Sequence, residues 1–221
     1  MTRNPEAPVR MGKDSIEVDG KSVTAAEKIY WMLNKPRSLV TTADDDQGRE
    51  TVYAKLPKGF PWMSPVGRLD KASEGLLLFT NDSEWAARIT APESHLDKIY
   101  HVQIAAVAGE DLLHALERGV IDKDGEVLRA KHAKRIREGE KNSWIELMLD
   151  EGKNRQIRRM LEESGVEILR LIRVAIGPLQ LGTLAKGEAR PLTQQEKAAI
   201  DQALRIRVIQ QTNSSRTVNS Q

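Results

Sequence analysis

Residues 67–82 read GRLDKASEGLLLFTND and join a polar, charged loop to an apolar run. The run at residues 76–79 is continuous rather than alternating, which is typical of a strand buried on both faces. Asn81 and Asp82 follow it with side-chain oxygens that can cap a helix, and Pro92 ends that helix. The stretch therefore predicts a charged loop, a buried central strand and a helix.

Outward from this unit, strand-like and helix-like segments follow one another irregularly. Strands are predicted at residues 29–33, 63–66, 99–107, 130–136, 144–149 and 168–176, with a small hairpin edge near 15–20. Helices are predicted at residues 50–56, 111–117, 154–163 and 193–205. Thr193 and Glu196 have the spacing of a capping box. Because strict βαβ alternation is missing, the order favours an α+β fold with a mixed, largely antiparallel central sheet flanked by helices.

The composition removes several classes of protein. The 221 residues include no cysteine, which excludes a disulfide scaffold, a thiolate zinc site, an iron–sulfur cluster and a cysteine nucleophile. The four histidines lack metal-ligand spacing, and the glycine patterns of nucleotide-binding loops are absent, so we expect neither a metal nor a cofactor. The first residues do not resemble a signal peptide, and the apolar runs are too short to span a membrane. The expected location is the cytoplasm.

Positive charge is concentrated in one part of the chain. The whole sequence has a formal charge of +2, whereas residues 129–159 hold ten lysines and arginines against five carboxylates. Four of these cations lie in GKNRQIRRM (152–160), where a helix is predicted to begin. Cations and helix N-terminal N–H groups both attract phosphate, so the segment predicts a nucleic-acid contact. A solvated helix face is the usual alternative, but Ile157, Met160 and Leu161 would anchor the helix and fix its cationic side.

Asp70 is the candidate reactive group of the charged loop. Arg68 and Lys71 flank it, and neighbouring positive charge keeps a carboxylate ionised. An ionised carboxylate at the rim of a cleft suits a nucleophile or a base. A plain surface loop with an Arg–Asp pair explains the same residues, and composition leaves both interpretations open.

Five segments resemble, in order, the motifs of the pseudouridine synthases, in the branch of the small-subunit synthase A and the large-subunit synthases B, E and F of ribosomal RNA. They are LNKPRSLVTT (33–42), GRLDKASEGLLLFTND (67–82), KIYHV (98–102), EGKNRQIRRM (151–160) and LIRVAIGPLQLG (171–182). The resemblance covers residues 28–205. An isolated RLD would be a weak signal, whereas five linked motifs in family order are specific. Within the branch, the short N-terminal region makes the compact synthase E type the most similar.

The resemblance implies an enzyme that isomerises a specific uridine in RNA to pseudouridine without a metal, nucleotide or organic cofactor. Asp70 matches the catalytic aspartate, Tyr100 the tyrosine that packs on the uracil ring, and Arg158 the basic residue paired with the aspartate. The target nucleotide would be flipped out of its helix to reach them. The residues implied in substrate and RNA binding are Arg68, Leu69, Lys98, Lys153, Asn154, Arg155, Gln156, Ile157 and Arg159.

The resemblance also implies a domain organisation and a partner. Residues 28–208 would form the catalytic domain, built from two interleaved α+β subdomains, and residues 209–221 a disordered tail. Residues 1–27 are an extension too short for the S4-like RNA-binding module of the family, so no complete S4 domain is expected. The expected partner of this monomer is ribosomal RNA, 23S rather than 16S, or a ribosome assembly intermediate, and no membrane. A non-catalytic rRNA-binding assembly protein is the alternative.

Overall fold

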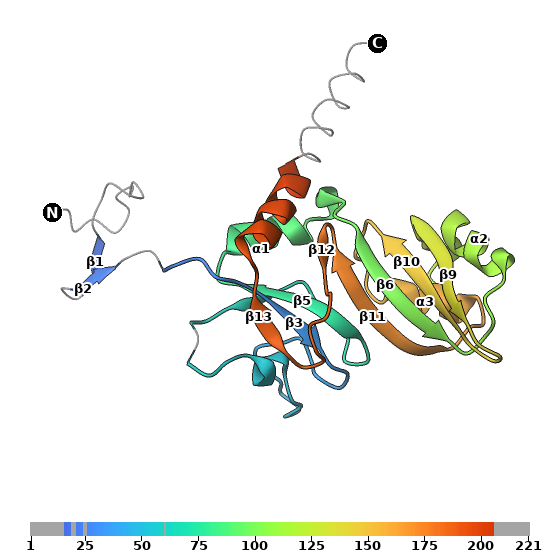
Figure 1. The fold of residues 1–221 in the computed structure, drawn as a ribbon, viewed down its shortest axis with the longest axis horizontal. Coiled ribbons are helices and arrows are strands. Elements are labelled where there is room, and N and C mark those ends of the chain that lie inside the picture. Colours follow the sequence, from blue (N-terminus) through green and yellow to red (C-terminus); the bar gives the residue numbers. More distant parts are fainter. Residues whose placement is uncertain (1–15, 19–20, 24–25, 60, 206–221) are drawn as a thin grey trace, which may run out of the picture.

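One mixed sheet forms the centre of the computed structural model, which describes residues 16–18, 21–23, 26–59 and 61–205. The main path of the sheet runs in the order β13-β3-β5-β11-β6-β10-β9, with β4 beside β5 and β12 beside β11 (Figure 1). Its strands are β3 (Tyr30–Lys35), β4 (Ser64–Val66), β5 (Glu74–Thr80), β6 (Lys98–Ile104), β9 (His132–Glu138), β10 (Ser143–Leu149), β11 (Ile168–Ile176), β12 (Leu179–Gln180) and β13 (Ala189–Pro191). Two short hairpins complete the described strands: β1 (Ile16–Val18) with β2 (Lys21–Val23), and β7 (Val120–Ile121) with β8 (Val127–Leu128).

Helices cover both faces of this sheet. They are α1 (Ser83–Thr90), α2 (Glu110–Arg118), α3 (Gln156–Glu163), the 3-10 turns η1 (Val52–Lys55) and η2 (Pro92–Ser94), and a helix over residues 194–205. Asp82 caps α1 by accepting a hydrogen bond from the Trp85 N–H, as its position in the sequence predicts. The capping box is also confirmed, because the Thr193 N–H donates to Glu196 Oε2 and the Glu196 N–H donates to Thr193 Oγ1.

The sheet consists of two antiparallel halves that meet at a narrow seam. Among the strand pairs of the described residues, only β5 and β11 run parallel, and they pair through two residues of each strand. At the seam, Gly75 has φ +101°, and a Cβ added to it would lie 2.2 Å from the Arg173 carbonyl oxygen. Only glycine therefore fits this position.

A buried carboxylate spans the same seam. Glu74, in β5, forms ion pairs with Arg170 of β11 and with Lys186. Burial alone would raise the pKa of Glu74, but the hydrogen bonds from these two cations outweigh it and hold the pKa below its ordinary value. The charged form of Glu74 thus ties the two halves of the sheet together.

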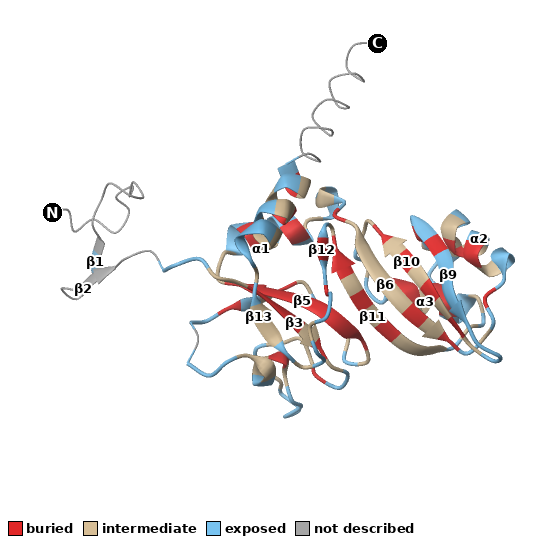
Figure 2. Cartoon of the chain, viewed as in Figure 1, coloured by how far each residue is buried: buried red, intermediate tan, exposed pale blue. Residues whose placement is uncertain are grey.

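Because side chains alternate along a strand, the buried residues divide between the two faces of the sheet. Leu77 and Phe79 of β5 pack with Leu69 in one cluster, here called the loop cluster, whereas Leu76 and Leu78 face α1 and the helix over residues 194–205. Figure 2 shows β5 buried along its whole length and the edge strand β9 mostly exposed. The continuous apolar run of the sequence therefore indicated the central strand correctly.

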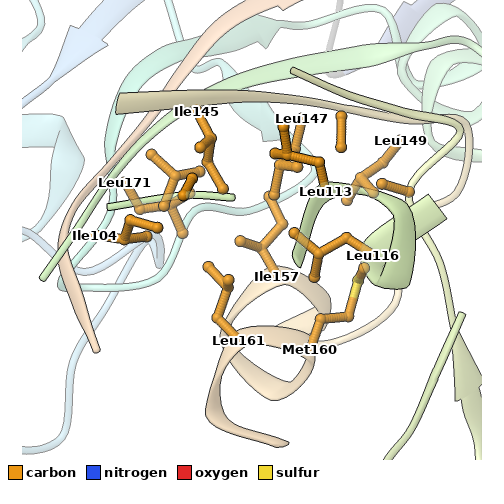
Figure 3. Close-up of a cluster of buried hydrophobic side chains, with 14 of the residues drawn as sticks. Ile104, Leu113, Leu116, Ile145, Leu147, Leu149, Ile157, Met160, Leu161 and Leu171 are labelled. Atoms are coloured by element: carbon orange, nitrogen blue, oxygen red, sulfur yellow. The ribbon is translucent and has the colours of Figure 1, made fainter. Parts of the chain in front are cut away.

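A second cluster packs α2 and α3 against the other half of the sheet. In this α3 cluster, Ile157 of α3 points toward Leu147 of β10, and Met160 lies beside Leu116 of α2 (Figure 3). Tyr100 packs against both the α3 cluster and the loop cluster. The two clusters therefore lie on the same face of the sheet, and Tyr100 lies where they meet.

These observations confirm the α+β class and the largely antiparallel sheet. Some predicted elements differ in detail: the helix at residues 50–56 is the 3-10 turn η1, the strand at 99–107 ends at Ile104, and the strand at 130–136 lies at His132–Glu138. Most of the extension at 1–27 and the whole tail at 209–221 lie outside the described residues, and the domain limits remain predictions. None of the described helices combines the length and apolar content that a membrane span requires.

Candidate active site

The loop between β4 and β5 presents Asp70 at the seam of the sheet. The Ser73 N–H donates to the Asp70 carbonyl at 2.9 Å and closes a tight turn just before β5. The Ser38 N–H donates to the Lys71 carbonyl at 2.8 Å. Thr41 Oγ1 donates to the carbonyl of Leu69 at 2.8 Å. The backbone around Asp70 is therefore fixed, while its carboxylate is 34% exposed and accessible.

The buried side chain of Lys35 supports the loop that carries Asp70. Its side chain is fully buried at the end of β3, and its ammonium donates to the carbonyl oxygens of Pro36, Asp70 and Ser73 at 3.1, 3.1 and 2.9 Å. Burial lowers the pKa of Lys35 to about 8, although the charges of Asp70 and Glu74 act in the opposite direction. Lys35 therefore positions the main chain of the Asp70 turn.

This buried ammonium predicts a pH-dependent stability difference between the protein and a Lys35→Met variant. The folded chain gives up the Lys35 proton near pH 8, whereas the unfolded chain keeps it until its ordinary pKa. Because the unfolded state binds more protons between these values, the free energy of unfolding of the wild type relative to Lys35→Met rises with pH from about 8 upward, by at most about 3 kcal/mol. Urea unfolding of both proteins from pH 7 to pH 10 measures this difference.

The matched control is Lys71→Met, because Lys71 is exposed and lies in the same loop. Its stability difference from the wild type is expected to stay flat over the same pH range. A flat difference for Lys35→Met would mean that the buried ammonium keeps its ordinary pKa in the folded protein.

Two arginines of the α3 region face the Asp70 carboxylate. Arg158 Nε lies 3.5 Å and Arg155 Nη1 lies 3.8 Å from Asp70 Oδ2. Arg158 is only 15% exposed and also donates from Nη2 to Ser73 Oγ at 3.2 Å, whereas Arg155 is 53% exposed. Burial lowers the pKa of Arg158, and the charge of Asp70 partly offsets this effect. Arg158 is thus the orienting partner of Asp70, and Arg155 is a second cation open to solvent.

The backbone at the start of α3, next to the two arginines, has an unusual conformation. Arg155 is the N-cap of α3 and adopts a left-handed conformation, φ 49° and ψ 28°. Non-glycine residues rarely adopt this region, and such residues concentrate at functional sites. Ile157, Met160 and Leu161 hold the helix in the α3 cluster, so the position of both arginines depends on the core.

Tyr100 is the aromatic residue that lies where the loop cluster and the α3 cluster meet. In β6 it lies opposite Leu147 of β10 and opposite Arg173 of β11. The loop cluster against which it packs includes Leu69, the residue that precedes Asp70. Asp70, Arg158 and Tyr100 come from three separate segments, and the seam between the two halves of the sheet brings these segments together.

The predicted RNA-binding residues fall into two groups. Arg68, Asn154 and Arg155 are exposed. Lys98, half-buried at the start of β6 and two residues before Tyr100, is engaged within the protein, as are the others. Lys153 pairs with Glu126 and Glu151, and Gln156 donates to Glu151 and to the Arg129 carbonyl. Arg159 pairs with Asp122 and Glu126, and Ile157 and Leu69 are buried.

Part of the positive charge of residues 129–159 is paired with carboxylates of the protein itself. Acidic side chains of the β7–β8 hairpin neutralise part of the positive charge at residues 129–159. Lys131, Lys134 and Arg135 also have carboxylate partners. The concentration of charge in the sequence therefore overstates the charge available to a ligand, and Arg155 is the exposed cation nearest to Asp70.

Several residues of the site were not identified from the sequence. They are Lys35, Ser73 and the Glu74–Arg170 pair. Each forms a hydrogen bond between residues that lie at least 35 positions apart in the sequence. A lysine at the end of an apolar strand, in LNKP, was the one signal that a charged side chain is buried there. Within the described residues, no group of three or more acidic or histidine side chains is arranged to hold a metal ion.

The fold and the site together present a carboxylate, Asp70, beside two arginines at the seam of a mixed α+β sheet. A solved structure described as "Crystal structure of pseudouridylate synthase" is similar over 80% of this chain and 76% of that chain, with a TM-score of 0.70 and 33% identity. The model of the family "RNA pseudouridylate synthase" matches residues 29–163. The chain belongs to this family and is therefore an RNA pseudouridine synthase, an isomerase.

Curated relatives agree with this assignment. The chain is 40% identical over 190 residues to "Ribosomal large subunit pseudouridine synthase B" of Bacillus subtilis (strain 168), covering 84% of this chain and 76% of the relative. It is 36% identical over 208 residues to an "Uncharacterized RNA pseudouridine synthase" of Aquifex aeolicus (strain VF5), covering 93% and 80%. The resemblance to the branch is confirmed, and the narrower resemblance to the synthase E type stays a prediction.

Proposed function

We propose that this synthase isomerises a specific uridine of ribosomal RNA, in the large-subunit 23S molecule, with Asp70 as the nucleophile or base. The observation that carries the proposal is the Asp70 carboxylate, fixed by its backbone contacts and oriented by Arg158 at 3.5 Å. The target class is supported by the relative whose name specifies the large ribosomal subunit. The chain would act as a cytoplasmic monomer on free rRNA or on an assembly intermediate.

The reaction breaks the N1–C1′ bond of uridine and joins C1′ to C5. The hydrogen on C5 leaves as a proton, and N1 gains a proton, so the product has the same composition as the substrate. Asp70 supports the bond exchange as nucleophile or base, and Arg158 keeps it oriented. Tyr100 would pack on the uracil ring and lie close enough to take part in the proton transfer. No step calls for a redox group.

The uridine must leave its helix before these groups can reach it, at a cost of a few kcal/mol. Exposed Arg155 and Arg68 would offset this cost by holding the displaced backbone phosphates. Lys98 and Asn154 would extend the same contact.

Salt dependence separates the cations that contact phosphate from those that are paired within the protein. Arg155→Gln removes an exposed cation beside Asp70, so we expect the slope of log Kd against log salt to fall by about 0.7 to 0.9. Lys153→Gln removes a cation already paired with Glu126 and Glu151, and its slope should change little. Filter-binding titrations of an rRNA fragment at several salt concentrations measure both slopes. Equal slopes for Arg155→Gln and the wild type would mean that Arg155 does not contact the RNA phosphates.

The experiment that tests the proposed function is a map of pseudouridines in the rRNA of cells with and without the gene. We expect one 23S position to lose its modification in the deletion and to regain it when the wild-type gene is returned. If every rRNA position keeps its modification in the deletion, the ribosomal target is wrong.

A further inference from the structure

Trp62 is an exposed aromatic side chain away from Asp70. Its exposed fraction is 65%, and it is the one aromatic residue among the strongly exposed large hydrophobic side chains of the described residues. The other tryptophans are buried or partly buried. Scattered aliphatic residues on a surface need no explanation, but a bare indole ring offers a large π surface to water.

The indole of Trp62 is held in place from one side. It stacks on the Tyr53 ring with centroids 5.1 Å apart and an interplanar angle of 13°. Tyr53 meets Phe79 of β5 edge-to-face at 5.9 Å, and its hydroxyl donates to the Met63 carbonyl at 2.8 Å. One face of Trp62 is therefore covered by a ring that is itself anchored, which leaves the exposed area on the other face and the edges.

This pair lies on the same face of the sheet as the active site. Tyr53 packs against the loop cluster, which contains Leu69 and which Tyr100 also contacts. From Glu74, beside the Asp70 turn, to Phe79 is five residues of β5. At about 3.3 Å per residue, Phe79, against which Tyr53 packs, lies roughly 17 Å along β5 from Glu74. A stacked nucleic-acid strand covers that distance in roughly five nucleotides at about 3.4 Å each.

Two lysines lie close to the pair in the sequence. Lys55 ends η1 with only a loose contact to Glu50 at 3.7 Å, and Lys58 is exposed in the loop that leads to Trp62. An aromatic face next to lysines is the combination that binds single-stranded nucleic acid, because bases stack on the ring and phosphates pair with the cations.

We propose that Trp62, supported by Tyr53, is a stacking platform for an unpaired base of the RNA substrate that lies outside the active site. The proposal deepens the proposed function and rests on its assignment of RNA as the substrate. The platform takes any base, because every base has a π face, so it contributes affinity and selects unpaired RNA rather than a sequence.

The test compares Trp62→Ala, Trp62→Phe and Ile121→Ala in binding to a 12-nucleotide oligouridylate. Trp62→Ala should weaken binding roughly 5- to 150-fold, whereas Trp62→Phe keeps a ring and should stay within about threefold of the wild type. Ile121 is also 65% exposed but has no ring, so Ile121→Ala should bind like the wild type. The salt slope should be the same for all four proteins, because stacking releases no counterions.

Tryptophan fluorescence gives an independent readout that needs no catalysis. Oligouridylate should quench the wild type, and the quenching should disappear in Trp62→Phe although that variant still binds. A fully paired 12-base-pair RNA should show neither the quenching nor the Trp62→Ala defect.

Two results overturn the platform: unchanged oligouridylate affinity in Trp62→Ala, or an equal loss in Ile121→Ala. The first would leave Trp62 as a surface for some other partner, and the second would indicate unspecific apolar contact. Neither depends on which rRNA uridine is modified, so failure of the platform and failure of the ribosomal target can be told apart.

Discussion

Asp70→Asn is expected to abolish pseudouridine formation and to leave the fold intact. The amide keeps the size of the carboxylate but removes its charge and its ability to act as a nucleophile or base. Removal of a nucleophile or base that the chemistry depends on lowers kcat by roughly 10³-fold or more. Because the Asp70 side chain is one-third exposed and its ion pairs are partly solvated, the free energy of unfolding should change by about 1 kcal/mol or less.

The measurement is complementation of a deletion strain followed by pseudouridine mapping of its rRNA, with urea unfolding of the purified variant. Asp46→Asn is the matched control, since Asp46 is an exposed carboxylate of the 41–50 loop. It should restore modification fully. Full modification by Asp70→Asn would remove Asp70 from the chemistry. If Asp70→Asn left every modification and every cellular phenotype unchanged, the non-catalytic assembly role would be favoured.

Gly75→Ala is the substitution expected to damage the fold most. The new Cβ would lie 2.2 Å from a backbone oxygen of β11, and φ +101° is a conformation that alanine rarely adopts. The strands cannot move apart cheaply, because the buried Glu74 of β5 is tied to Arg170 of β11 beside this position. We expect a loss of about 3–5 kcal/mol in the free energy of unfolding, or failure to fold.

Urea unfolding and thermal melts followed by circular dichroism measure this loss. Gly109→Ala serves as the control, because Gly109 has ordinary backbone angles at the N-cap of α2 and open space around its Cβ position. It should cost about 1 kcal/mol or less. Wild-type stability of Gly75→Ala would mean that the seam between β5 and β11 is looser than its geometry indicates.

The seam also explains why stability and activity are coupled at this position. Asp70 enters the site from the β3–β5 half of the sheet, whereas Tyr100 and Arg158 belong to the β6–β10 half. Any change that separates β5 from β11 therefore separates the carboxylate from its arginine. A weakened Gly75 variant that still folds should lose more activity than its remaining folded fraction predicts.

Local patterns in the sequence determined much of this protein. The apolar run at residues 76–79 marked the central strand, Asp82 and the Thr193–Glu196 pair marked helix starts, and the five motifs marked the family. These signals are readable because they depend on neighbours within a few residues, through side-chain alternation, capping hydrogen bonds and helix periodicity. Asp70 could be selected for the same reason, since its loop and the strand after it are contiguous.

The resemblance to the family named Arg158 as the partner of Asp70, but only the tertiary structure decided how the two meet and which other charges are paired. Arg158 lies 88 positions after Asp70 and reaches it through the strand pairing and the anchoring of α3 in the core. Lys35 is buried under the Asp70 turn. Lys153 and Arg159 are paired with acids of the β7–β8 hairpin, whereas Arg155 faces solvent. Whether a charged side chain is paired or available depends on strand register and packing between distant segments, which residue order alone does not specify.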